Sequence, residues 1–381
     1  MRVTIPRVIA GTFGVAVAGY VFVVAPGLPG SAGSNVAGIA GHGPARTSRP
    51  PARWHSVATP FPPRGRQFIG IMTTGGPYNL TDLDNFTAAV KHKPEVYEFS
   101  QGWALNQFNR GVIEGVARRG MLPMISWEPW NYRSESRIDS LRGYQPAYRL
   151  SNIIDGRYDK YITSWAEGVK GLGFTIALRF AHEMNGYWYP WCVLANGNTI
   201  GQYVKAWRHV HDIFRKVGAT NVIWVWSPNV VWNGSVDLAT LYPGNAYVDW
   251  IGLSGYYGTP GVLGYEDFDT IFDRTIAELR TFTRKPLVIT ETGATDTSGL
   301  MTRYIIQMFR ELPAHTNIIG VIWYESFNVV DWRVSDHPPA AAAFAAGFAK
   351  RRYQMSWQPG MVPLLTVGRS PRSGGRAAGR R

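Results

Sequence analysis

The sequence predicts a (β/α)8 barrel on the basis of three observations. Short apolar segments that suit buried strands recur eight times after about residue 67. Amphipathic segments with helical spacing lie between most of them. Polar and aromatic residues follow most of the strands, as expected at the carboxyl face of a barrel. A doubly wound sheet is the alternative, but no glycine-rich phosphate loop follows any strand, and Thr73-Thr74-Gly75-Gly76 indicates only a turn.

The strands can be placed by residue number. In chain order, the expected strands are Phe68–Met72, Val96–Ser100, Met121–Trp127, Phe174–Phe180, Val222–Ser227, Val248–Ser254, Leu287–Glu291 and Ile318–Tyr324. Helical spacing follows most of them: Phe108, Val112 and Val116 recur every four residues, and Gly120 suits the end of that helix. Similar spacing is found over 161–169, 207–214, 268–279 and 304–309. Only the connection after the fifth strand lacks a long helical pattern.

Two basic tails flank the predicted barrel. Residues 1–66 contain seven Arg and no acidic residue, and residues 350–381 contain Lys350, seven Arg and no acidic residue. These tails carry +7 and +8 of the formal net charge of +13, so the body between them carries −2. A nucleic-acid binder would need a basic stripe on the folded body, which this sequence lacks. We therefore expect no nucleic-acid partner. The carboxyl-terminal basic tail either contacts the cell envelope or has no partner.

The amino-terminal residues indicate export. Arg2 and Arg7 precede a largely apolar segment from Val8 to Ala25, which suits a cleaved signal or a membrane anchor. We expect a secreted monomer, with an anchored form that faces outside as the alternative. The predicted division is a signal peptide or anchor at 1–32, a Pro/Gly-rich linker at 33–66, the barrel at 67–357 and a disordered basic tail at 358–381.

Two strand ends carry carboxylates. The fourth strand leads into Arg179, His182 and Glu183, followed by a loop that includes Trp188, and the seventh strand ends in Glu291. Charged groups beside a buried strand are costly unless they are paired or used. Glycoside hydrolysis uses two carboxyl groups that flank one cleft, and aromatic rings stack well against sugars. Each residue also has a structural interpretation: Glu183 could pair with Arg179, Glu291 could cap a helix and His182 could lie in the core.

Other strand ends supply candidate substrate contacts. These are Trp127, Glu128 and Trp130 after the third strand, Tyr256 after the sixth and Trp323 in the eighth. Trp127 suits the core as well as a substrate contact, and Glu128 competes for a catalytic role.

Further features restrict the chemistry. Tyr257 is an alternative to Tyr256, and Glu325 suits an ion pair at the barrel rim. The His residues are scattered, so we expect neither a metal site nor a cofactor. The single Cys192 cannot form an internal disulfide and suits packing.

The motif His182-Glu183-Met184-Asn185-Gly186 resembles that of glycoside hydrolase family 26, in the large clan of retaining (β/α)8 hydrolases. The resemblance covers about residues 67–330. It implies that Glu183 is the acid/base and Glu291 the nucleophile, and that His182 and Tyr256 orient the nucleophile and the sugar. It also implies that Trp188 stacks in the leaving-group subsite and that Trp323 floors the subsite of the cleaved sugar.

The family acts chiefly on β-1,4-mannan, and some members act on mixed-linkage β-glucan or β-1,3-xylan. The resemblance therefore implies a retaining endo-β-1,4-mannanase whose substrate is a β-linked polysaccharide. The alternatives are an endo-β-glucanase on mixed-linkage β-1,3-1,4-glucan and a carbohydrate-binding barrel without catalysis. Phe180-Ala181 and Tyr324 depart from the pattern of many mannanases, which have Pro-Phe and an Arg at these places.

Overall fold

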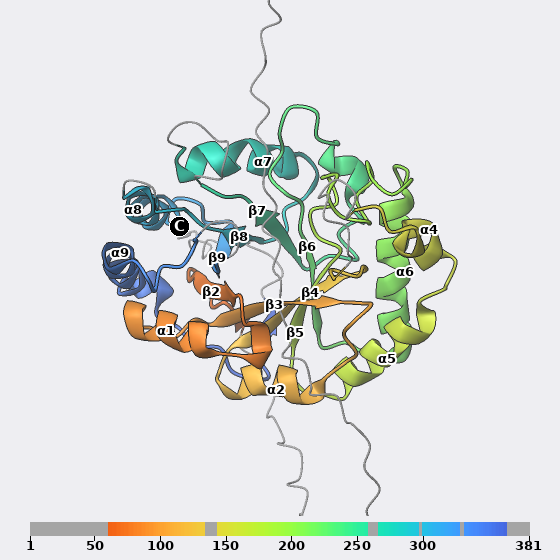
Figure 1. Ribbon diagram of the computed structural model, residues 1–381, viewed down its shortest axis with the longest axis horizontal. Coiled ribbons are helices and arrows are strands. Elements are labelled where there is room, and N and C mark those ends of the chain that lie inside the picture. The colour runs from red at the N-terminus through yellow and green to blue at the C-terminus, as the bar shows by residue number, and fades with distance from the viewer. Residues whose placement is uncertain (1–59, 134–142, 258–265, 297–298, 328–330, 364–381) are drawn as a thin grey trace, which may run out of the picture.

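Eight parallel strands close into a barrel, and helices surround it (Figure 1). The structure is a computed structural model that describes residues 60–133, 143–257, 266–296, 299–327 and 331–363. The predicted signal or anchor, most of the predicted linker and most of the basic tail lie outside these residues. Among the residues described, none of the helices has the length and apolar character needed to cross a membrane.

The barrel strands confirm the eight predicted strands, with ends that differ by at most two residues. They are β2 (Phe68–Thr73), β3 (Val96–Gly102), β4 (Leu122–Glu128), β5 (Ile176–Phe180), β6 (Val222–Trp226), β7 (Trp250–Ser254), β8 (Leu287–Thr292) and β9 (Ile318–Glu325). Each strand pairs in parallel with the next, and β9 pairs with β2 to close the barrel. The predicted (β/α)8 fold is therefore correct.

Helices follow most strands, as the periodicity predicts. They are α1 (Thr81–Val90), α2 (Arg110–Arg118), α4 (Leu150–Ile154), α5 (Asp159–Lys170), α6 (Gln202–Val217), α7 (Phe268–Phe282), α8 (Leu300–Glu311) and α9 (Pro338–Phe348). Short 3-10 helices are η1 (Gly76–Tyr78), η2 (Pro146–Tyr148), η3 (Leu238–Leu241) and η4 (Arg351–Tyr353). Only η3 lies between β6 and β7, so the connection that lacks a helical pattern also lacks a long helix.

Local sequence explains where the helices begin and end. Asn109 caps α2, because its side chain accepts a hydrogen bond from the backbone N–H of Val112. Gly218 ends α6 with a positive φ of 83°, a conformation that costs glycine little. Val116 is buried in α2, as predicted, together with Ile113 and Ala117, whereas Val112 is half-buried and Phe108 precedes the helix.

The folded unit extends beyond the predicted edges at both ends. Strand β1 (Pro60–Phe61) pairs in parallel with β10 (Val362–Pro363). The Phe61 ring is 1% exposed and stacks on Phe68, with ring centroids 5.4 Å apart. The predicted barrel limits of 67 and 357 are therefore too narrow. A strand of two residues shows no periodicity, so the sequence pattern could not reveal this pairing.

Candidate active site

Arg179 on β5 lies inside the barrel and contacts five other strands or their ends. Its guanidinium is fully buried, which is costly unless its donors are satisfied and its charge is balanced. The donors reach Ser227 Oγ at 3.0 Å, Ser126 Oγ at 3.1 Å, Glu98 Oε1 at 3.1 Å, Ser254 Oγ at 2.7 Å and Glu291 Oε1. Two of the acceptors are carboxylates, so Arg179 forms the charged centre of the site.

Glu291 on β8 is held through both of its carboxylate oxygens. Arg179 Nη1 donates to Oε1, and the Tyr256 hydroxyl donates to Oε2 at 2.7 Å. The neighbouring Tyr257 instead stacks on Tyr304 of α8, with ring centroids 5.1 Å apart, so it faces the helices. Of the two tyrosines considered from the sequence, Tyr256 is the one that contacts Glu291.

Glu183 follows β5 in a strained turn. Ala181 and Glu183 have φ values of 46° and 54°, in the left-handed region that residues other than glycine seldom adopt. Hydrogen bonds to the backbone of Glu183 hold the turn: the Glu183 N–H donates to Ser227 O at 2.7 Å, and the Cys192 Sγ–H donates to Glu183 O at 3.3 Å. Such unusual backbone conformations persist where the surrounding structure enforces them. Here the turn orients the carboxylate of Glu183.

The Glu183 carboxylate accepts two side-chain hydrogen bonds. Asn229 Nδ2 lies 3.1 Å from Oε1, and Trp188 Nε1 lies 2.8 Å from Oε2. Burial, together with the charge of Glu291, raises the pKa of Glu183 to about 7 against the opposing effect of Arg179. A carboxyl group that keeps its proton near neutral pH suits a general acid.

Charge also sets the protonation of the basic groups in the site. Burial favours a lower pKa for Arg179, but the neighbouring carboxyl groups, Glu291 foremost, outweigh it and raise this pKa, so Arg179 stays cationic. Burial and the charge of Arg179 lower the pKa of His182 well below its usual range, so this imidazole is neutral.

His182 contacts Tyr189 rather than the carboxylates. Its Nε2 lies 3.3 Å from the Tyr189 hydroxyl, and its Nδ1 has no hydrogen-bond partner among the described residues. The hydrogen bonds that orient Glu291 come from Arg179 and Tyr256. The structure thus does not assign His182 the expected hold on Glu291.

Glu128 and Trp130 lie together near His182. Glu128 accepts hydrogen bonds from Ser100 Oγ at 2.7 Å and from Trp130 Nε1 at 2.8 Å, and burial raises its pKa to about 7. The Trp130 ring packs edge-on against Tyr189, with ring centroids 5.2 Å apart, and Tyr189 contacts His182. These residues form a buried polar and aromatic cluster beside the two carboxylates.

Two tryptophans predicted to contact substrate face away from the site. Trp127 is fully buried against Trp165 of α5, with ring centroids 5.2 Å apart, and against Phe214 of α6. Trp323 packs edge-on against Phe344 of α9, with ring centroids 5.5 Å apart. Strand side chains alternate between the barrel interior and the helices, and both tryptophans lie on the helix side. The predicted substrate contacts of Trp127 and Trp323 are therefore wrong.

The surroundings of the site include residues that the sequence analysis did not select as substrate contacts. Tyr324 and Trp332 lie beside Tyr256, with ring centroids 5.9 Å and 5.1 Å away. Glu98 contacts Arg179 from the middle of β3. A single charged residue inside an otherwise apolar strand was the available signal for Glu98. No periodic signal marks Trp332, which follows the last barrel strand.

Glu325 serves the loop that carries Trp332. Its carboxylate accepts hydrogen bonds from the backbone N–H groups of Val334 at 2.7 Å and Ser335 at 2.8 Å. Glu325 therefore holds the backbone of this loop rather than forming the ion pair at the barrel rim that the sequence suggested.

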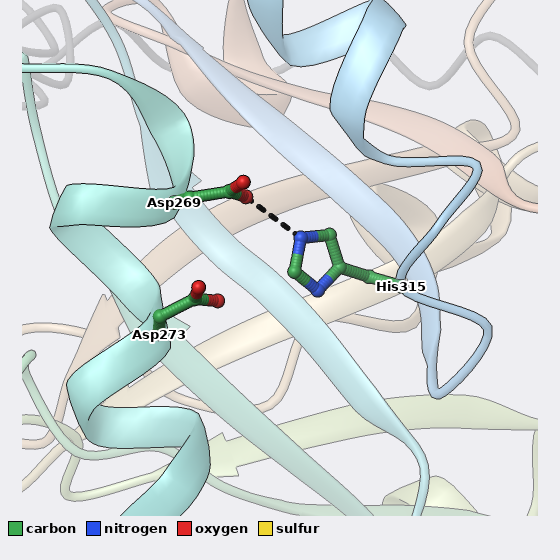
Figure 2. A group of neighbouring side chains, drawn as sticks. All are labelled: Asp269, Asp273 and His315. Atoms are coloured by element: carbon green, nitrogen blue, oxygen red, sulfur yellow. Dashed lines mark hydrogen bonds and ion pairs between the residues drawn. The ribbon is translucent and has the colours of Figure 1, made fainter.

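A surface group of three residues has the composition of a metal-binding set. Asp269 and Asp273 project from α7 toward His315, which lies before β9 (Figure 2), and their ligand atoms lie within 4.8 Å of one another. The His315 Nε2 lies 2.8 Å from Asp269 Oδ1. The sequence analysis expected no metal set, because these residues are far apart in the chain. His315 precedes the amino end of β9, whereas Glu183 and Glu291 lie at the carboxyl ends of strands.

Comparison with known proteins gives a consistent family likeness. The family model for glycosyl hydrolase family 26 matches residues 131–308. Endoglucanase H of Acetivibrio thermocellus is 35% identical over 243 residues, which are 62% of this chain and 25% of that protein. A mannan endo-1,4-beta-mannosidase of Bacillus subtilis is 23% identical over 248 residues, which are 58% of this chain and 64% of that protein. The chain thus spans less than two thirds of each of these relatives.

Solved structures show the same fold. The Bacillus subtilis mannanase man26 superposes with a TM-score of 0.52 at 19% sequence identity, over 77% of this chain and 86% of that chain. Identity at this level supports the barrel fold.

Proposed function

We propose that the chain, whose residues 131–308 match the model of glycosyl hydrolase family 26, belongs to this family and is a retaining endo-β-glycanase that hydrolyses β-1,4-linked mannan. One observation carries the chemistry. Two buried carboxyl groups share a site in which Glu183 has a pKa raised to about 7, whereas Glu291 accepts hydrogen bonds from a cationic Arg179 and from Tyr256. One group can therefore give a proton while the other attacks, as double displacement requires.

In the first step, Glu183 protonates the glycosidic oxygen and Glu291 attacks the anomeric carbon. The bond between that carbon and the leaving oxygen breaks, and a covalent glycosyl ester forms on Glu291. Arg179 and Tyr256 hold the attacking carboxylate in one orientation, which avoids an entropy cost at the moment of reaction. The Trp188 ring donates a hydrogen bond to Glu183 from its Nε1, and it is the proposed contact of the leaving sugar.

In the second step, Glu183 is ionised and accepts a proton from water. The water oxygen bonds to the anomeric carbon, and the ester bond to Glu291 breaks. Glu183 regains its proton and Glu291 its charge, so the enzyme returns to its starting state. Two inversions at one carbon leave the product with the configuration of the substrate.

The substrate proposal can be tested with purified polymers. We expect hydrolysis of galactomannan to exceed that of barley mixed-linkage glucan, xylan and cellulose. Mixed-linkage glucan is the second candidate, because the relative that is 35% identical is named an endoglucanase and Tyr324 departs from the mannanase pattern. Activity confined to starch, or none from folded protein, contradicts the proposal.

The roles of the two glutamates can be separated with azide. Glu183→Ala should lose about 10²–10⁴ in rate on polymer and should still form the glycosyl-enzyme from an aryl glycoside with an acidic phenol. Azide needs no general base, so it should restore turnover and give a product of retained configuration. Glu291→Ala should fail on both substrates. Release of the inverted anomer by wild type, read by proton NMR, contradicts the assignment.

We further propose that the protein acts outside the cell as a monomer. The apolar segment after Arg2 and Arg7 supports export. Protein from the medium should begin near Gly33 and elute as a monomer. Recovery of intact Met1 in membranes would support the anchored form instead. Salt-sensitive retention on cells that is lost without the basic tail would support envelope contact.

A further inference from the structure

A third buried carboxyl group shares Arg179 with the proposed nucleophile. Glu98 lies in the middle of β3 and is fully buried. Arg179 Nη1, which donates to Glu291 Oε1, also donates to Glu98 Oε1 at 3.1 Å. Ser126 Oγ donates to the same Glu98 oxygen at 2.6 Å. One guanidinium nitrogen therefore serves two carboxyl groups.

The surroundings of Glu98 favour its neutral form. Its second oxygen, Oε2, is buried and has no hydrogen-bond partner among the described residues, and an anionic oxygen in that position is costly. In the barrel register, Met72 on β2 and Met124 on β4 lie beside it. The charged groups that act on it are Arg179 from β5 and Glu291 from β8.

The hydrogen bonds of Glu98 do not require a negative charge. Oε1 accepts both bonds, and the carbonyl oxygen of a protonated carboxyl group also has two lone pairs with which to accept them. Burial raises the pKa of Glu98 to about 7, with the charge of Glu291 adding to the rise and Arg179 opposing it. The proton is therefore held up to about neutral pH.

We propose that Glu98 is a positioning residue that holds a proton during the reaction and so leaves the charge of Arg179 to Glu291. The inference rests on the proposed function, in which Glu291 is the nucleophile. When Glu98 loses its proton, two carboxylates compete for Arg179 Nη1. Glu291 then loses its fixed orientation, because only the Tyr256 bond remains undivided.

The test isolates the glycosylation step. Dinitrophenyl β-mannobioside and dinitrophenyl β-cellobioside release a phenol that needs no protonation, so the ionisation of Glu183 does not limit the burst. The burst rate is measured by stopped flow from pH 5 to pH 9 for wild type, Glu98→Ala and Glu98→Gln. Circular dichroism and melting temperature establish that each variant is folded.

Glu98→Ala removes the acceptor of two hydrogen bonds, and its burst rate is expected to fall by about 10–100-fold through misplacement of the nucleophile. Glu98→Gln keeps a carbonyl oxygen at that place and cannot ionise, so it should recover most of that loss. The wild-type burst rate should fall as the pH rises through about 7, because Glu98 ionises there. The rate of Glu98→Gln should stay level over this range.

Glu95→Gln is the matched control. Glu95 is also buried, and it accepts a backbone hydrogen bond from Ile69 at 3.0 Å at the opposite end of the barrel. Burial raises its pKa as well. We expect Glu95→Gln to lower the melting temperature without moving the pH profile of the burst. A merely structural role for Glu98 would give that same result.

Three results would overturn the proposal. The first is a burst profile shared by wild type and Glu98→Gln, and the second is a Glu98→Ala rate equal to that of wild type. The third is Glu98→Gln as slow as Glu98→Ala, because the charge itself would then be needed. If Glu98→Ala fails to fold, the comparison of wild type with Glu98→Gln decides. Folded wild type with no activity on any glycan refutes the proposed function as well, whereas a burst with unaltered profiles refutes only the role of Glu98.

Discussion

Replacing Arg179 with methionine tests the charge balance of the barrel interior. Arg179→Met removes the cation that contacts Glu98 and Glu291 and leaves the Ser126, Ser227 and Ser254 hydroxyls without their donor. Removing one partner from a buried ion pair costs about 3–5 kcal/mol in the free energy of unfolding. We expect the upper part of this range at pH 8, because two carboxyl groups lose the same partner.

The cost should be smaller at pH 5. Without Arg179, a buried carboxyl group stays in place only by taking up a proton, so the folded variant binds more protons than its unfolded chain. A carboxyl group with a raised pKa contributes stability that is full below its unfolded pKa and is lost as the pH rises through its folded pKa. The slope is about 1.4 kcal/mol per pH unit for each extra proton bound. Stability relative to wild type should therefore decrease from pH 5 to pH 8.

Urea unfolding at the two pH values measures this difference, and the burst rate measures activity. The burst rate should fall by about 10²-fold or more, because the nucleophile is no longer oriented. Arg179→Lys is the control: it keeps the charge but cannot reproduce a planar fork with this many acceptors, so its losses should be intermediate. Unfolding of Arg179→Met at the wild-type urea midpoint at pH 8 would refute the proposed charge balance.

Three further predictions concern the surroundings of the site. Trp323→Phe should cost about 1–3 kcal/mol of stability, because it loses packing and a 3.0 Å hydrogen bond to a backbone carbonyl. The rate constant of hydrolysis should stay within about twofold, and a large loss of rate would show that Trp323 contacts the substrate. The fragment 60–363 should unfold at a higher temperature than the fragment 67–357, because the shorter fragment lacks the Phe61 ring, whose burial contributes about 1.5–3 kcal/mol to stability. Equal melting temperatures would contradict the new domain edge. Treatment with EDTA should leave polymer hydrolysis unchanged, because the proposed chemistry needs only carboxyl groups, and a loss restored by metal ions would implicate the cluster of Figure 2.

The strands and their order could be predicted because parallel barrel strands are buried on both faces and appear as continuous apolar runs. The same property hides the direction of each side chain. On β9, both Trp323 and Tyr324 are buried, and apolar content alone does not distinguish the face toward the helices from the face toward the site. The shift of one residue along a strand moves a ring to the opposite face, which explains the error at Trp323.

The carboxylates at strand ends could be predicted from their cost, but their partners could not. Glu183 and Glu291 follow apolar strands, so their burial had to be compensated. Glu183 is compensated by hydrogen bonds from Asn229 and Trp188. Glu291 is compensated by Arg179, whose contacts on β3, β4, β7 and β8 depend on the closed barrel rather than on spacing along the chain. The role of Glu98 can be inferred only from this geometry.

The central claim is that Glu291 forms the covalent bond to the sugar. Mass spectrometry of peptides from wild-type protein incubated with dinitrophenyl 2-deoxy-2-fluoro-β-mannobioside tests it directly, because the fluorine slows release of the glycosyl-enzyme. We predict that the sugar is attached to the peptide that contains Glu291. Attachment to Glu128, or turnover of natural substrate by an enzyme that never becomes labelled, would contradict the claim.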